Sequence, residues 1–305
     1  MTGRAVVVGD ALIDELRDDT GVREFVGGAA LNVAVGLSRL GVPATLIAMV
    51  GDDEAGDHIR SYLRDFGVEL LATPSSLGSS RAVSTRSAGG EPTYEFNAAA
   101  KARRIRFGAA EREAIAAASI VAVSCFPFDD VAQTLEFTEA VRTAGVGLAI
   151  DPNPRSGMMS DRAEFVVGFE ALAVGASLVK VGEDDSRLLY GDELDALRAR
   201  LVDVGVGAVL ATEGAHGATI EAGPTVVTRP ISSLSGRIVD TMGAGDAAFA
   251  TAVAGLLEGT PADADEWGAL LERAMDVAAA TCRFEGALLR LPSAVAGVDL
   301  DQIGT

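Results

Sequence analysis

Short apolar runs that alternate with stretches of helical periodicity dominate this 305-residue sequence. The runs are continuous and rich in valine and isoleucine, which is typical of strands buried on both faces of a sheet. Several of the stretches between them end on glycine, the residue that commonly follows a helix. Expected strands cover 5–9, 45–51, 119–124, 146–151, 177–181 and 207–212, and expected helices cover 29–41, 54–67, 109–118, 130–145 and 193–205. This order predicts an α/β fold with a doubly wound, mainly parallel sheet flanked by helices.

Two segments interrupt the alternation. Residues 11–26 and 80–97 are typical of short alternating strands joined by turns, "DDTG" in the first and "AGGEPT" in the second. They predict a small β-sheet beside the main one, either a surface layer or a lid that closes over a ligand. Because no linker rich in Pro, Gly or Ser divides the chain, we expect one domain over residues 1–305 with this lid inside it.

Charge and composition exclude several classes of function. The net charge of −19 argues against a nucleic-acid partner, because binding phosphates requires a basic face. No apolar run reaches the roughly 18 residues that a membrane span needs, so we expect no membrane partner. The first residues, "MTGRAVVVGDALIDE", do not resemble a signal peptide, and we expect a cytoplasmic protein. The two cysteines and two histidines have no metal-site spacing.

The stretch "VDTMGAGDAAFATAVAGLLEG" (239–259) predicts an anion site at the start of a helix. A helix N-terminus has unpaired N–H groups and partial positive charge, and glycines let an anion approach the backbone closely. Gly243, Ala244 and Gly245 would supply these amides. The same helix end should keep Asp246 ionised, so that it can accept a hydroxyl proton beside a transferring phosphoryl group. A plain helix-capping role for Asp246 is the alternative on the residues alone.

This stretch resembles the D-T-x-G-A-G-D signature of the ribokinase/fructokinase family, the PfkB carbohydrate kinases. "FVGGAALNVAVGLSRLG" (25–41) is similar to the N-terminal signature of that family, and further matches, such as "AIDPNPR" (149–155) and "LVKVGEDDSRLLYG" (178–191), fill the interval. The resemblance implies a ribokinase-like fold with a β-sheet lid. It also implies transfer of the γ-phosphoryl of ATP to a primary alcohol with Mg²⁺, Asp246 as base and the three preceding amides as anion hole. "GGAALN" and "DPNPR" look most like fructokinases.

The resemblance also assigns the binding residues. Sugar contacts fall on Asp14, Gly27, Gly28 and Asn32, and the loop "ATEGAHGA" places Thr212, Gly214 and Gly217 beside ATP. Two further cations, Arg155 and Lys180, either face phosphate or form surface ion pairs. The acceptor stays open between fructose, ribose, 2-keto-3-deoxygluconate and a nucleoside. An acidic acceptor would need a cation in the lid, and Arg81, Arg86, Lys101 and Arg103 are available. A silent sugar- or nucleotide-binding protein on the same fold is the alternative from another class.

One motif departs from the family pattern. The metal-associated N-x-x-E appears here as Gly182 to Asp185, so Asp185 keeps a carboxylate for Mg²⁺ but the asparagine is lost. Asp240 either supports the anion-hole loop or joins a monovalent-cation site, such as one for K⁺. The lid of such kinases often forms a dimer surface, so a homodimer is expected through it.

Overall fold

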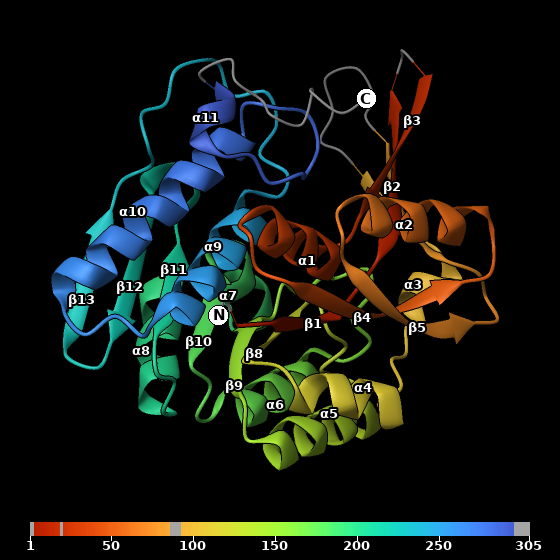
Figure 1. Cartoon of the computed structure of the whole chain (residues 1–305), viewed down its shortest axis with the longest axis horizontal. Coiled ribbons are helices and arrows are strands. Elements are labelled where there is room, and N and C mark those ends of the chain that lie inside the picture. Colours follow the sequence, from red (N-terminus) through yellow and green to blue (C-terminus); the bar gives the residue numbers. More distant parts are fainter. Residues whose placement is uncertain (1–2, 19–20, 86–92, 296–305) are drawn as a thin grey trace.

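The computed structural model describes residues 3–18, 21–85 and 93–295. Within these residues, nine strands form one sheet in the order β13-β12-β11-β10-β9-β8-β1-β4-β5 (Figure 1). The parallel strands are β1 (Ala5–Gly9), β4 (Ala44–Gly51), β5 (Glu69–Ser75), β8 (Ile120–Ser124), β9 (Gly147–Asp151), β10 (Leu178–Gly182) and β11 (Val209–Thr212). The antiparallel strands β12 (Ala218–Ala222) and β13 (Thr225–Arg229) complete one edge. The predicted doubly wound α/β fold is confirmed.

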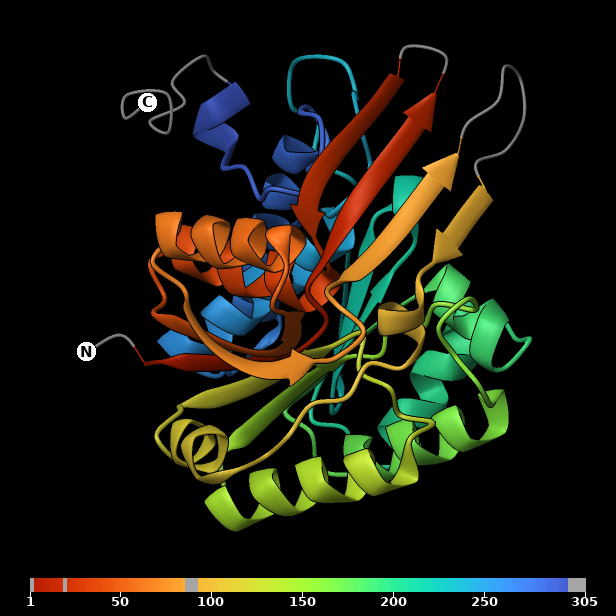
Figure 2. The same cartoon turned by 90° about the vertical axis from the view of Figure 1, so that its right-hand side faces the viewer.

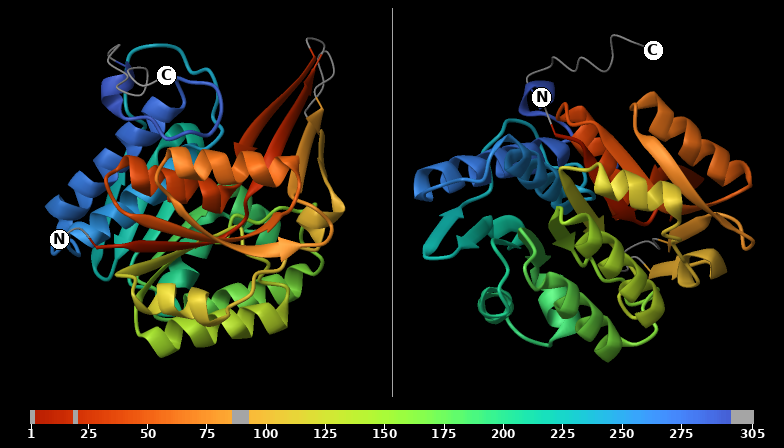
Figure 3. Two further views of the ribbon diagram at one scale, coloured as in Figure 1. Left: turned by 45° about the vertical axis from the view of Figure 1, so that its right-hand side comes forward. Right: turned by 60° about the horizontal axis from the view of Figure 1, so that its bottom comes forward.

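Helices cover both faces of this sheet (Figure 3). In β1, Ala5 and Val7 belong to one core and Val6 and Val8 to the other, which explains why the strand is apolar at every position. The first core includes side chains of α1 (Ala29–Arg39), α2 (Glu54–Asp65), α9 (Ala244–Glu258) and α10 (Ala264–Thr281). The second includes those of α4 (Ala109–Ala116), α5 (Val131–Ala144), α6 (Arg162–Ala173), α7 (Glu183–Leu189) and α8 (Leu194–Asp203). The short elements are α3 (Ala98–Lys101), η1 (Gly214–His216) and α11 (Pro292–Val295).

A separate four-stranded sheet projects beside the main body (Figure 2), formed by the described parts of the two interrupting segments. Its order is β3-β2-β6-β7, with β2 (Leu12–Asp18), β3 (Gly21–Gly27), β6 (Ser80–Thr85) and β7 (Thr93–Phe96). Each segment is an antiparallel pair, and the parallel pairing of β2 with β6 joins them. Residues 19–20 and 86–92 of the predicted lid lie outside the described residues.

None of the helices in the described part of the chain combines the length and the apolarity that a membrane span requires.

Candidate active site

The candidate active site lies where the parallel strands of the large sheet end. Gly9 of β1 pairs in register with Ser124 of β8, which in turn pairs with Asp151 of β9. Gly182, at the end of β10, pairs with Thr212 at the end of β11. In open α/β sheets, ligands bind outside the carboxyl ends of the strands. The register therefore collects polar residues from distant parts of the chain at one edge of the sheet.

Helix α9 begins at this edge, on the loop that was predicted to hold an anion. Gly243, its N-cap, has φ 77°, and a Cβ there would lie 2.6 Å from the Cα and carbonyl oxygen of Ala287, so only glycine fits. Among the described residues, no side chain caps the helix, and the N–H of Ala244 donates a hydrogen bond of 3.3 Å to the carbonyl oxygen of Thr241. The positive end of α9 is therefore suited to bind phosphate oxygens.

Asp246 occupies the first turn of α9 and is buried. Its Oδ2 accepts a 2.8 Å hydrogen bond from Nδ2 of Asn32 on α1, a residue 214 positions earlier. Its Oδ1 accepts a longer bond of 3.5 Å from Nδ2 of Asn153, which follows β9. Asn153 has φ 37°, a left-handed conformation that is uncommon for a residue other than glycine and that concentrates at functional sites. Two amide groups from different elements thus orient this carboxylate.

Burial and neighbouring charges act in opposite directions on the carboxyl group of Asp246. Burial raises the pKa of Asp246, whereas the Asn32 hydrogen bond and the charges of Lys180 and Arg155 act to lower it and the charge of Asp10 to raise it. Desolvation of the carboxylate is the largest of these effects, so the pKa lies above its usual value. A base with a raised pKa takes a proton more readily near neutral pH.

Two further carboxylates lie near the start of α1. Asp10 follows β1, is buried, and accepts the N–H of Ala30 through Oδ1 at 3.0 Å. Burial and the charge of Asp10 raise the pKa of Asp14 on β2 to about 7. A Cβ on Gly27 would lie 2.2 Å from Oδ2 of Asp14. Gly28 has φ 108°, and a Cβ on it would collide with the carbonyl oxygen of Asp10. Of the predicted sugar residues, Gly27 therefore lies beside Asp14 and Gly28 beside Asp10, whereas Asn32 contacts Asp246.

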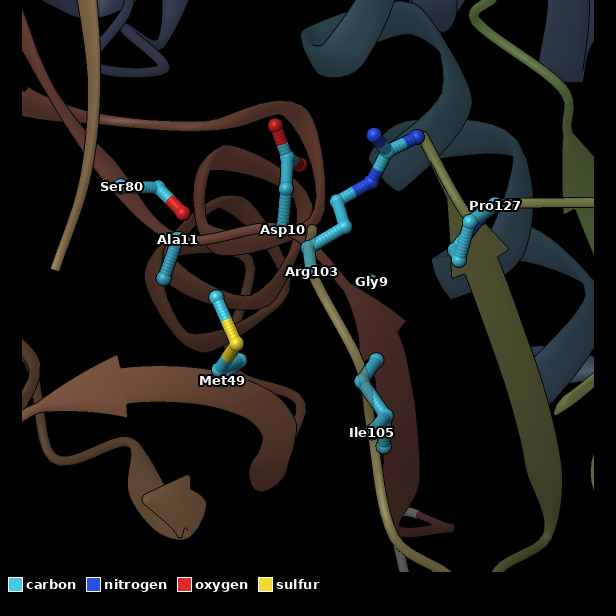
Figure 4. A pocket seen from close by; sticks show the side chains of 8 residues that line it. All are labelled: Gly9, Asp10, Ala11, Met49, Ser80, Arg103, Ile105 and Pro127. Atoms are coloured by element: carbon cyan, nitrogen blue, oxygen red, sulfur yellow. The ribbon is translucent and has the colours of Figure 1, made fainter. Parts of the chain in front are cut away.

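Asp10 also lines a small cavity, together with Arg103 (Figure 4). The cavity measures about 10 Å³, room for about one water molecule. The guanidinium of Arg103 donates through Nη1 to the carbonyl oxygens of Ala100 and Met158, and its buried Nε has no partner within the described residues. Arg81 instead pairs with Glu24 on the second sheet, and Arg86 lies outside the described residues.

The predicted nucleotide loop lies between β11 and β12. The hydroxyl of Thr212 donates to the carbonyl oxygen of Val181 at 3.3 Å. Gly214 has φ 52°, and Gly217 has φ 101° with a virtual Cβ only 2.1 Å from the carbonyl oxygen of Arg229. The loop is thus a tight turn between antiparallel strands, and it ends at the same sheet edge as the α9 loop.

The side chains of the two predicted metal residues, Asp185 and Asp240, both accept hydrogen bonds from backbone N–H groups. Asp185 accepts the N–H of Gly182 through Oδ2 at 2.7 Å, which leaves its other oxygen for a ligand. Asp240 accepts the N–H of Met242 at 3.0 Å and that of Gly286 at 3.1 Å, and thereby supports the anion-hole loop. Across the described residues, no group of three or more histidine, cysteine, aspartate or glutamate side chains forms a metal-binding cluster. Asp185 alone fits Mg²⁺, because that ion keeps several waters and takes few protein carboxylates when phosphates complete its shell.

Lys180 lies inside the site, so it does not form the surface ion pair that the sequence left open. Its Nζ lies 3.2 Å from Oδ2 of Asp151, and the two side chains are 9% and 0% exposed. Burial acts to lower the pKa of Lys180, but the charges of Asp151, Asp185 and Asp246 outweigh it and raise the pKa, so the ammonium keeps its proton.

Sequence reasoning did not single out Asp10, Asp151 or Asn153. Asp10 and Asn153 follow the ends of β1 and β9, and Asp151 is the last residue of β9. A polar residue directly after a buried parallel strand was the available signal.

Comparison with known proteins identifies the family and the fold of the chain. The profile of the pfkB family carbohydrate kinases matches residues 3–294. The chain belongs to this family. It is therefore an ATP-dependent carbohydrate kinase with a ribokinase-like fold, as the resemblance of its two signatures predicted.

Individual relatives agree with this assignment. A fructokinase of Rhizobium leguminosarum bv. trifolii is 29% identical over 253 residues, which cover 78% of this chain and 75% of the relative. An ATP-dependent 6-phosphofructokinase of Thermoanaerobacterium thermosaccharolyticum is 25% identical over 94% of this chain and 90% of its own length. The structure of fructokinase with bound ATP from Xylella fastidiosa superposes with a TM-score of 0.78 at 21% identity, over 98% of this chain and 99% of that one.

Proposed function

We propose that this kinase transfers the γ-phosphoryl group of ATP to a primary hydroxyl of a sugar, with fructose as the first acceptor to test. The observation that carries the proposal is the position of Asp246, a buried carboxylate on the first turn of α9, 2.8 Å from the amide of Asn32. A base and an anion hole on one helical turn suit an alcohol that attacks a phosphoryl group. The fructokinase of Rhizobium leguminosarum supports the choice of fructose.

Each residue then has a defined role. Asp10, Asp14 and Asn32 bind the sugar hydroxyls and direct the primary hydroxyl toward Asp246. Asp246 accepts the hydroxyl proton as the sugar oxygen bonds to the γ-phosphorus, and the bond to the β-phosphate oxygen breaks, leaving ADP with the electron pair. The amides of Gly243, Ala244 and Gly245 receive the phosphoryl oxygens. Thr212, Gly214 and Gly217 hold the nucleotide.

Cations complete the proposal. Asp185 would hold Mg²⁺ through its free oxygen, and the ion would neutralise the charge of the phosphates when bound. For Asp240 we propose support of the anion-hole loop, with K⁺ beside it as an added requirement to test. We further propose a homodimer through the second sheet, whose strand β3 exposes Val22, and a cytoplasmic location, where ATP is made and used.

A second class of acceptor is favoured by Arg103. Its guanidinium lies beside Asp10 and keeps a buried, unpartnered Nε within the described residues, so it suits a sugar that carries a carboxylate or phosphate. The 6-phosphofructokinase relative also supports this class. Ribose and nucleosides are the neutral alternatives, and a silent binding protein is the alternative from another class.

A coupled ADP assay over fructose, ribose, tagatose, 2-keto-3-deoxygluconate, fructose 6-phosphate and nucleosides tests the proposal. We expect one acceptor to stimulate ADP release and Asp246→Asn to lower kcat by about 10²–10⁴-fold, the usual contribution of a general base. Sugar and ATP should still raise the melting temperature of this variant, and Asp57→Asn, on the exposed face of α2, should behave as the wild type. If the ligands shift the melting temperature of the wild type but no ADP is released, the protein is a silent binder. Full turnover by Asp246→Asn would contradict the role of Asp246 as the base.

A further inference from the structure

A buried ion pair lies directly beneath the first turn of α9. Along β10, Leu178 belongs to the core shared with α9, and because side chains alternate along a strand, Lys180 points to that same face. A Cβ on Gly245 would lie 3.2 Å from Nζ of Lys180. The ammonium therefore lies where a side chain at position 245 would be, next to the turn to which we assign the γ-phosphate, and Gly245 leaves that space open.

The stability of the fold does not by itself explain the buried ion pair of Lys180 and Asp151. Removing two charges from water is energetically costly, and apolar residues of the same volume often stabilise a fold as well or better. An ammonium has three N–H donors. Within the described residues, the hydrogen bonds of Lys180 go only to the two oxygens of Asp151, at 3.2 and 3.4 Å. This leaves donor capacity for a ligand anion.

Composition indicates that the position requires a compact ammonium. Only two of the 25 basic residues in the chain are lysines, and one of them is Lys180. A planar guanidinium is larger and has fixed donor directions, whereas an ammonium is a point charge with rotatable donors. A chain whose basic residues are mostly arginine has lysine in the narrow space between Asp151 and Gly245.

We propose that Lys180 is a further catalytic residue of the kinase, whose ammonium contacts an oxygen of the transferring phosphoryl group, and that Asp151 is a positioning residue that holds it. The proposal rests on the proposed function, since the phosphoryl group must occupy the α9 turn. Lys180 stays protonated throughout, and the hydroxyl proton goes to Asp246. A fixed cation here would oppose the negative charge on the phosphoryl oxygens during transfer.

Lys180→Met tests the role, with Lys180→Met/Asp151→Asn as the decisive second variant. The single variant leaves Asp151 buried without its partner and could unfold, whereas the double variant has no unpaired charge. Arg64→Met, which removes a cation from the exposed face of α2, is the matched control. Each is measured for melting temperature, for kcat and apparent KM with the best acceptor, and for affinity toward ATP and toward ADP with aluminium fluoride, a mimic of the transferring phosphoryl group.

We expect the double variant to melt near the wild-type temperature and bind ATP nearly as well, while kcat and the affinity for ADP with aluminium fluoride both fall by about 10²–10³-fold. If Lys180 only paired with Asp151, the double variant would regain wild-type turnover and affinity for the mimic, and that result would overturn the proposal. The mimic needs no identified acceptor. An inactive sugar panel with a lysine-dependent affinity for the mimic would therefore count against the proposed function alone.

Discussion

Replacing Asp14 with asparagine should stabilise the folded protein at pH 8 and leave its stability nearly unchanged at pH 4. Burial first, and then the charge of Asp10, raise the pKa of Asp14 from 3.8 to about 7. Because this folded-state pKa exceeds the unfolded value, the native protein binds the extra proton between these two pH values, and the free energy of unfolding falls as pH rises through that window. Asparagine keeps the shape and carries no charge.

The size of the effect follows from the shift. About three pKa units at about 1.36 kcal/mol each set an upper bound of about 4 kcal/mol at pH 8. Water that enters the cleft screens part of this cost, so we expect a gain of about 1–4 kcal/mol. Repulsion from the charges of Asp10 and Asp246 is already part of this shift.

Urea unfolding at pH 4, 5, 6, 7 and 8 measures the difference between the variant and the wild type. Asp57→Asn, which removes an exposed carboxylate from α2, is the matched control and should show no such pH-dependent gap. A gap between Asp14→Asn and the wild type that stays constant with pH, or a variant that is less stable at pH 8, would refute the electrostatic account of this site. The same variant should bind sugar more weakly, because it lacks the carboxylate that we propose binds a sugar hydroxyl.

Two further predictions concern the backbone and the second sheet. Gly243→Ala should lower the free energy of unfolding by more than about 2 kcal/mol, since φ 77° is strained for alanine and its Cβ would lie 2.6 Å from the backbone of Ala287. The control is Gly223→Ala, where φ is 56° and a Cβ would meet nothing within 4 Å. In the same urea assay, this control should lower the free energy of unfolding by only about 1 kcal/mol. If the second sheet closes on substrate as a lid, sugar with a non-hydrolysable ATP analogue should slow proteolysis of residues 11–26 and 80–97. Equal cleavage rates with and without ligands would contradict closure.

Much of the architecture was predictable because it depends on local patterns. The expected strand at 5–9 has those bounds in β1, and the expected helix at 54–67 is α2 over Glu54–Asp65. The hairpin of β12 and β13 was not predicted as part of the main sheet. Its pattern of burial alternates in β13, as at an edge, and therefore lacks the continuous apolar run that identified the central strands. The lid role and the single-domain count remain predictions.

The sequence by itself determined the fold class, the family and the glycine-rich start of α9, because periodicity and signature motifs are written along the chain. Only the tertiary structure decided that Asn32 reaches Asp246, that Asp151 and Lys180 are buried together under Gly245, and that burial raises the pKa of Asp246. The physical reason is that contacts and desolvation depend on which strand ends meet. The register of the parallel sheet sets that arrangement, and local patterns in the sequence do not predict this register.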